Sequence, residues 1–129
     1  MEIGLERFVL AAAAVLDIDP EQLVPAIKVS LAESALAAPF ASFGGHDFYP
    51  DPITRAAVLA SRIMRNHPLP DGNKRVALVL MDIYLQGQGF EFGADPDKVD
   101  EVFRAVAARS LAEDDFADWL REHVARPPL

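Results

Sequence analysis

Residues 65–75 read RNHPLPDGNKR, and the apolar run VALVLMDIYL follows directly at 76–85. The run is apolar nearly all round, so it predicts a central buried helix over 73–87. A preceding helix must end before Pro68, because the residue before a proline disfavours helical backbone. We therefore expect two helices, joined by this short polar loop, at the centre of an all-α fold.

The bulk composition restricts the class of protein. A length of 129 residues predicts one domain over 1–129 with a single core. The net charge of −8 argues against direct nucleic-acid binding, because a phosphate backbone requires a basic surface. The chain has no cysteine, no basic leader, and no apolar run near its start longer than 8–16. We expect a cytoplasmic protein with no membrane partner.

Three Asp-Pro pairs divide the chain, at 19–20, 51–52 and 95–96. Each predicts a helix start, because aspartate caps the first N–H groups and proline tolerates the first helical position. The tetrapeptide SLAE at 110–113 has the spacing of a capping box and predicts a fourth start at Ser110. With the apolar spacing, these signals predict helices near 3–16, 20–27, 29–37, 52–66, 73–87, 96–109 and 111–124.

The segment PFASFGGHDFYPDP at 39–52 does not fit a helix. Aromatic residues flank the pair Gly44-Gly45, which predicts two short extended arms joined by a tight turn. The expected fold is therefore a compact all-α bundle of six to seven helices with one short β-hairpin.

The loop before the central helix has the chemistry of an anion site. The first N–H groups of a helix are unpaired, and its N-terminus carries positive dipole charge. Gly72 would let a phosphate approach the backbone, and Lys74 and Arg75 add cations. Those cations cost ~0.3–1 kcal/mol each at a helix start, which a bound polyphosphate would offset. Asp71 suits Mg²⁺ and His67 can accept a proton, a combination typical of phosphoryl or nucleotidyl transfer.

The remaining charged residues have simpler interpretations. His46 lies at the expected hairpin tip as an exposed turn residue, and His123 lies near the end of the last helix as a structural one. Three histidines so far apart do not suggest a metal cluster. Arg62 and Arg65 are expected on a solvated face.

The string HPLPDGNKR at 67–75 resembles the signature of the Fic/Doc (death-on-curing) family, H-x-F-x-[D/E]-[A/G]-N-[K/G]-R. The matching residues are His67, Asp71, Gly72, Asn73 and Arg75. Leu69 replaces the usual phenylalanine, which we interpret as a tolerated swap at an apolar anchor. Lys74 is typical of the Doc branch, since most Fic adenylyltransferases carry glycine there. Similarity in AESALAAPFASFGGHDFYP, GFEF and WLREH extends the resemblance over most of the chain from about residue 31.

The resemblance implies a role for each motif residue. His67 would be the base that deprotonates a target hydroxyl, and Asp71 would bind Mg²⁺. The phosphates of ATP would be held by Gly72, Asn73, Lys74 and Arg75. An extended target segment would pair with a flap through main-chain hydrogen bonds. The flap residues would be Ser42, Phe43, Gly44, Gly45, His46, Asp47, Phe48 and Tyr49.

Family members with N-K-R are associated with kinase-type transfer, in which ATP lies reversed relative to the adenylyltransferases. The resemblance therefore implies a Doc-like toxin that phosphorylates a Ser or Thr of a translation factor, with elongation factor Tu as the suspected target. A Phd-type antitoxin would silence it in trans, since the chain lacks the S/T-x-x-x-E-G/N motif of self-inhibited Fic proteins. Two alternatives stay open: AMP transfer (AMPylation) at the same site, and a catalytically weak module that binds an antitoxin.

Overall fold

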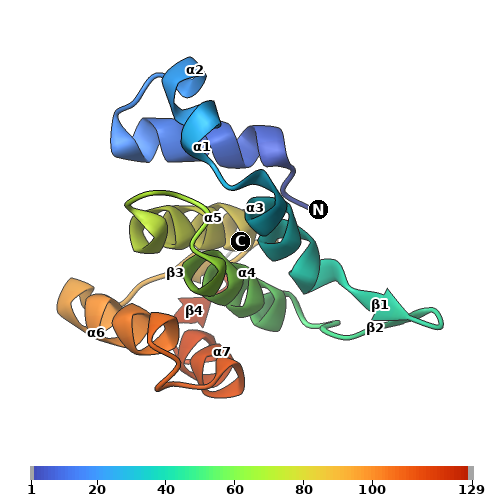
Figure 1. Cartoon of the computed structure of the whole chain (residues 1–129). Coiled ribbons are helices and arrows are strands. Elements are labelled where there is room, and N and C mark those ends of the chain that lie inside the picture. Colours follow the sequence, from blue (N-terminus) through green and yellow to red (C-terminus); the bar gives the residue numbers. More distant parts are fainter. Residues whose placement is uncertain (1, 128–129) are drawn as a thin grey trace.

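Seven α-helices and four two-residue strands form the described part of the chain, residues 2–127 of a computed structural model (Figure 1). The helices are α1 (Leu5–Leu16), α2 (Pro20–Leu23), α3 (Val29–Ala37), α4 (Pro52–Asn66), α5 (Asn73–Gly87), α6 (Pro96–Ala107) and α7 (Glu113–Arg121). Short 3₁₀ turns at Val24–Ala26 and Ala38–Phe40 extend α2 and α3. The strands pair as two antiparallel ladders, β1 (Ser42–Phe43) with β2 (His46–Asp47), and β3 (Glu91–Phe92) with β4 (Val124–Ala125). The predicted all-α class with a β-hairpin is confirmed.

Helices α4 and α5 form the centre of the molecule. Figure 1 shows them between α1 and α2 on one side and α6 and α7 on the other. Both central helices bury apolar side chains toward several neighbours, as the sequence run at 76–85 predicts. The buried apolar residues of α5 are Val76, Ala77, Leu80, Met81, Tyr84 and Leu85. The loop between α4 and α5 is therefore held between two helices that the core fixes in place.

The three Asp-Pro helix starts are confirmed. The carboxylates of Asp19, Asp51 and Asp95 each accept a hydrogen bond from a backbone N–H of the first turn, and proline follows at once in each case. Asp51 caps α4 most fully, because it accepts from the N–H groups of residues 53 and 54 at 3.3 and 3.2 Å. Such a cap contributes about 1 kcal/mol, so each start is fixed by local chemistry.

The predicted capping box at Ser110 is wrong. Helix α7 begins at Glu113 with Ala112 as its N-cap, and the Ser110 hydroxyl donates instead to the Ala105 carbonyl at 3.2 Å. Arg109 adopts left-handed backbone at φ 63°, which ends α6 and turns the chain. Ser110 therefore closes the end of one helix and does not open the next.

Glu113 has a tertiary role that its local spacing does not show. Its carboxylate accepts hydrogen bonds from Ser61 Oγ and Arg62 Nε, both at 2.7 Å, and lies 3.8 Å from Arg65. Arg65 also donates to the carbonyls of residues 106 and 111 at 3.1 and 2.9 Å. Both arginines therefore tie α4 to the α6–α7 region, which corrects the expectation of a solvated face.

Helix α7 is shorter than predicted at its C-terminal end as well as at its start. Helix α7 ends at Arg121, because residues 124–125 leave it to pair with β3. The predicted end at 124 assumed continued helical periodicity. A strand partner more than thirty residues upstream leaves no local mark in the sequence.

The predicted hairpin is present and projects from the body before α4 (Figure 1). Gly44 and Gly45 have φ values of 60° and 81°, which L side chains adopt at a cost and glycine adopts freely. Phe43 and Phe48 are 79% and 59% exposed, so the hairpin presents aromatic surface to solvent. Asp47 binds Arg55 of α4 at 3.0 Å, which anchors the hairpin at its base.

The segment before the hairpin is a bent pair of helical stretches, Pro20–Ala26 and Val29–Phe40, that meet at 93°. Across residues 2–127, no single helix has the length and apolar character needed to cross a membrane, while this bent pair meets those criteria by length and composition only. Here the second stretch packs Ala32, Ala35 and Leu36 into the core.

Candidate active site

His67 ends α4 and begins the motif loop. Its backbone is left-handed at φ 54°, and its N–H donates to the Ile63 carbonyl at 3.1 Å, which closes the last helical turn. Left-handed backbone is uncommon outside glycine, and histidine is one of the residues that adopt it more often than most. The side chain is exposed, while the next two residues, Pro68 and Leu69, are buried. The loop therefore turns its apolar residues inward and leaves the imidazole in solvent.

Asn73 holds the loop in shape from the first position of α5. Its Oδ1 accepts from the Leu69 N–H at 3.0 Å, and its Nδ2 donates to the Leu69 carbonyl at 2.9 Å. Leu69 is 1% exposed and Asn73 is 6% exposed, so these bonds replace water at buried backbone. The Asn73 amide is thus used to hold the loop, while its backbone N–H lies in the first turn of α5. The burial of Leu69 agrees with its interpretation as an apolar anchor.

The fold itself favours glycine at position 72, the N-cap of α5. Its φ is 78°, and a Cβ added there would lie 2.2 Å from Cδ2 of Leu16 in α1. The sequence suggested that the missing Cβ makes room for a phosphate, whereas the contact with α1 gives a structural reason for glycine. Helix α1 thus packs directly against the motif loop.

Asp71 lies at the mouth of the same helix start. Its Oδ1 accepts from the Gly72 N–H at 2.8 Å, and its side chain is exposed. Among residues 2–127, no group of three or more His, Cys, Asp or Glu side chains converges into a metal site. A single exposed carboxylate is the kind of ligand that Mg²⁺ usually takes when phosphate oxygens and water supply the other ligands.

The motif residues surround one cleft of about 480 Å³ between α4, α5 and α6. The predicted residues that line it are His67, Asp71, Gly72, Asn73, Lys74 and Arg75. Val76 N–H makes the first helical bond of α5, to the Gly72 carbonyl, so the N–H groups of 73–75 precede the helical hydrogen-bond ladder. The cleft therefore combines a proton acceptor, a carboxylate, positive dipole charge and cations.

Arg104 of α6 also lines this cleft, and the sequence did not point to it. It lies 29 residues after Arg75, on a helix whose distance from the loop depends on packing alone. Asp100 binds both Arg104 and the Nζ of Lys74, the latter at 3.5 Å. Three cationic side chains thus line one cleft of a chain with net charge −8, and two of them share the carboxylate of Asp100 as their partner.

The predicted flap lies apart from this cleft. None of residues 42–49 is among the described residues that line it, and the hairpin leaves the body at the opposite end of α4 from His67. Tyr49 reaches back along α4, with its hydroxyl 3.4 Å from Arg62. Through Arg62 the hairpin base joins the Glu113 network, which also holds the α4 end next to the motif.

Comparison with known proteins agrees with this arrangement. The Fic/DOC family matches residues 7–85, which include the hairpin, the motif loop and nearly all of α5. The chain is also 36% identical over 89 residues to Toxin Doc of Mycolicibacterium smegmatis, an alignment that covers 67% of this chain and 68% of that protein. The chain therefore belongs to the Fic/DOC family, and its likeness is to the Doc branch. The family match begins well before residue 31, where the motif-based resemblance began.

Proposed function

We propose that this chain is a Doc-like toxin that transfers the γ-phosphate of ATP to a Ser or Thr hydroxyl of a translation factor. The observation that carries the proposal is the single cleft that gathers all six motif residues around the start of α5. A similarity to a protein named Toxin Doc supports the toxin assignment. Elongation factor Tu, a cytoplasmic protein, is the target that the family resemblance implies.

The cleft binds the phosphates first. Backbone N–H groups of 73–75 donate to them, with Lys74, Arg75 and Arg104 as cationic partners. A Mg²⁺ ion held by Asp71 and the phosphates would neutralise developing charge there. This chain supplies orientation and charge, which provide most of the catalysis in phosphoryl transfer.

His67 takes the proton in the transfer step. An imidazole nitrogen accepts the hydrogen of the target hydroxyl, and the hydroxyl oxygen forms a bond to the γ-phosphorus. The bond from that phosphorus to the bridging oxygen breaks, and ADP leaves with the electron pair. The exposed position of His67 at the end of α4 suits a base whose partner is part of another protein.

AMP transfer is the alternative that keeps the same residues. Lys74 favours phosphate transfer, because a side chain at this helix position occupies space beside the phosphate site where the adenylyltransferases mostly carry glycine. Lys74 is 43% exposed and points to Asp100 at 3.5 Å, so it borders the cleft and does not fill it. The product mass separates the two reactions.

A Phd-type antitoxin is the proposed partner. It would silence the toxin by laying its C-terminal helix into a groove near the cleft. A catalytically weak antitoxin-binding module is the other candidate, and it would bind its antitoxin tightly while binding ATP weakly.

Expression of the chain alone tests the toxin proposal. We expect it to arrest growth, and we expect His67→Ala to restore growth at equal protein level. His123→Ala is the matched control, because the same substitution on the last turn after α7 leaves the cleft unchanged, and it should still arrest growth. Equal arrest by His67→Ala would remove His67 from the mechanism.

A further inference from the structure

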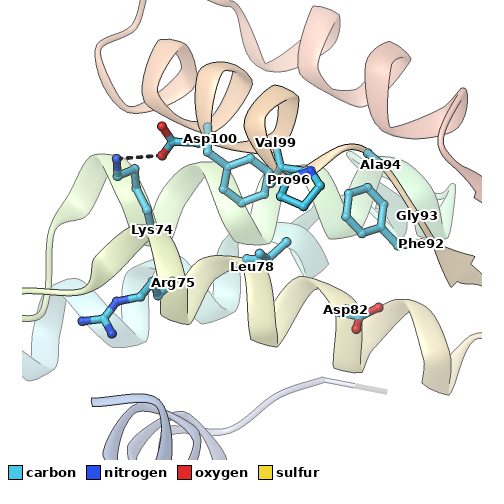
Figure 2. A pocket seen from close by; sticks show the side chains of 11 residues that line it. Lys74, Arg75, Leu78, Asp82, Phe92, Gly93, Ala94, Pro96, Val99 and Asp100 are labelled. Carbon is cyan, nitrogen blue, oxygen red and sulfur yellow. Dashed lines mark hydrogen bonds and ion pairs between the residues drawn. The ribbon is translucent and has the colours of Figure 1, made fainter.

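A second cavity of about 600 Å³ lies beside the His67 cleft. Figure 2 shows it between α5 and the segment that runs from β3 into α6. Its middle is apolar on both sides, with Leu78 facing Phe92 and Pro96 across the opening (Figure 2). Val99 and Phe103 of α6 complete the apolar lining. Its volume falls within the range of small-molecule sites.

The two cavities meet at the start of α5. Lys74 and Arg75 line both of them. The ion pair between Lys74 and Asp100, drawn in Figure 2, stands at this boundary. A molecule with its phosphates in the cleft can therefore continue along α5 into the second cavity without crossing the core.

The charged side chains of α5 make the two ends of the second cavity electrostatically different. Lys74, Leu78 and Asp82 follow one another at one-turn spacing on the same helix face, so a cation, an apolar side chain and a carboxylate lie within about 12 Å. Asp82 accepts a hydrogen bond from Gln86 at 3.0 Å, which fixes its carboxylate at the far end. A phosphate is favoured at the Lys74 end and repelled at the Asp82 end.

We propose that this cavity holds the nucleobase of the nucleoside triphosphate whose phosphates occupy the His67 cleft. The inference rests on the proposed function and extends it, because it assigns the base to the α5–α6 side of Lys74. Leu78, Phe92 and Pro96 supply apolar surface for a flat ring. The Asp82 carboxylate can accept a hydrogen bond from an exocyclic amino group, which favours adenine over uracil.

The experiment compares two probes, ATP and inorganic tripolyphosphate, each with Mg²⁺. The wild-type protein should bind ATP more tightly, because only ATP has a base to bury. Leu78→Trp and Ala94→Phe fill the cavity from opposite walls. We expect each to weaken ATP binding by about tenfold or more, the contribution of one stacked base. Tripolyphosphate binding should change less than about twofold, since its charge contacts lie in the cleft.

Leu10→Trp is the matched control, because Leu10 is 56% exposed on α1 and lines neither cavity.

The outcomes separate this inference from the proposal on which it rests. Wild-type protein that binds neither probe would contradict the phosphotransferase proposal itself. Unchanged ATP affinity in both filled variants would place the base elsewhere and overturn the inference alone. The inference is also overturned if the filled variants lose affinity for tripolyphosphate and for ATP equally. It is overturned as well if they keep their ATP affinity and lose affinity only for an antitoxin helix, which would make the cavity a protein-binding groove. A ratio of UTP to ATP affinity near one would remove the assigned role of Asp82.

Discussion

Replacing Asn73 by alanine tests whether the motif loop depends on one buried amide. The substitution removes two hydrogen bonds, at 3.0 and 2.9 Å, and leaves the N–H and carbonyl of Leu69 without their partner. Leu69 is 1% exposed, so water does not replace the lost bonds freely. Each of these two stranded buried groups costs about 1–3 kcal/mol. With partial relaxation of the loop, we expect a loss of about 2–4 kcal/mol in the free energy of unfolding.

Urea unfolding measures this loss directly. Trp119 is the single tryptophan of the chain and packs against Phe92 and Phe116, so its fluorescence reports the folded state. A loss of about 2–4 kcal/mol corresponds to a midpoint lower by about 1–2 M urea for a slope near 2 kcal/mol per molar. An unchanged slope would show that the shift in midpoint reports a change in stability and not a change in the surface exposed on unfolding.

Asn66→Ala is the matched control seven residues earlier. Asn66 Nδ2 donates to the Leu31 carbonyl at 3.0 Å, but this bond is exposed, so water can replace it. We expect a loss below about 1 kcal/mol. If Asn73→Ala costs no more than Asn66→Ala, the amide does not hold the loop and the reasoning is wrong.

Two further predictions concern the contacts that position the loop. Gly72→Ala should lose about 1–2 kcal/mol of unfolding free energy, because its φ of 78° strains an L residue and its Cβ would meet Leu16 Cδ2 at 2.2 Å. Leu16→Ala in the same protein should relieve the clash but not the backbone strain. The two substitutions should therefore be coupled in a double-mutant cycle of unfolding free energies, and losses that simply add would contradict the contact. Burial alone would raise the pKa of Glu113, but hydrogen bonds from Arg62 and Ser61 and the nearby arginine charges hold its pKa below the ordinary 4.5. Glu113 therefore stabilises the fold above pH 4.5, and this contribution is lost as the pH falls through its lowered folded pKa. Glu113→Gln should be less stable than wild type at pH 7, with a gap that narrows in acid, and a constant gap in denaturation measured from pH 7 to pH 3 would contradict this.

The elements that local chemistry fixes could be predicted from the sequence. Asp19, Asp51 and Asp95 each act through neighbours two or three residues away, so their helix starts are visible in the chain. The Gly44-Gly45 turn needs positive φ at both positions, and a pair of glycines in the sequence predicts such a turn. The central helix after Asn73 follows from its apolar run.

The errors occur where tertiary contacts outweigh local spacing. Glu113 has capping-box spacing from Ser110, yet its carboxylate gains more from Arg62, which lies about fifty residues earlier. The β3–β4 ladder likewise joins segments that no local pattern connects, and it shortens α7.

The candidate site shows the same division. His67, Asp71, Lys74 and Arg75 are close in the sequence, and the structure places all four on the lining of one cleft. The inward turn of the Asn73 amide and the approach of Arg104 from α6 depend on packing around the loop, which the motif does not encode.

The intact mass of purified elongation factor Tu tests the central claim most directly. Elongation factor Tu is incubated with ATP, Mg²⁺ and either the wild-type chain or its His67→Ala variant. We predict the added mass of one phosphate with the wild type and none with the variant. An added AMP would contradict phosphate transfer, and equal modification by both proteins would contradict the role of His67 as the base.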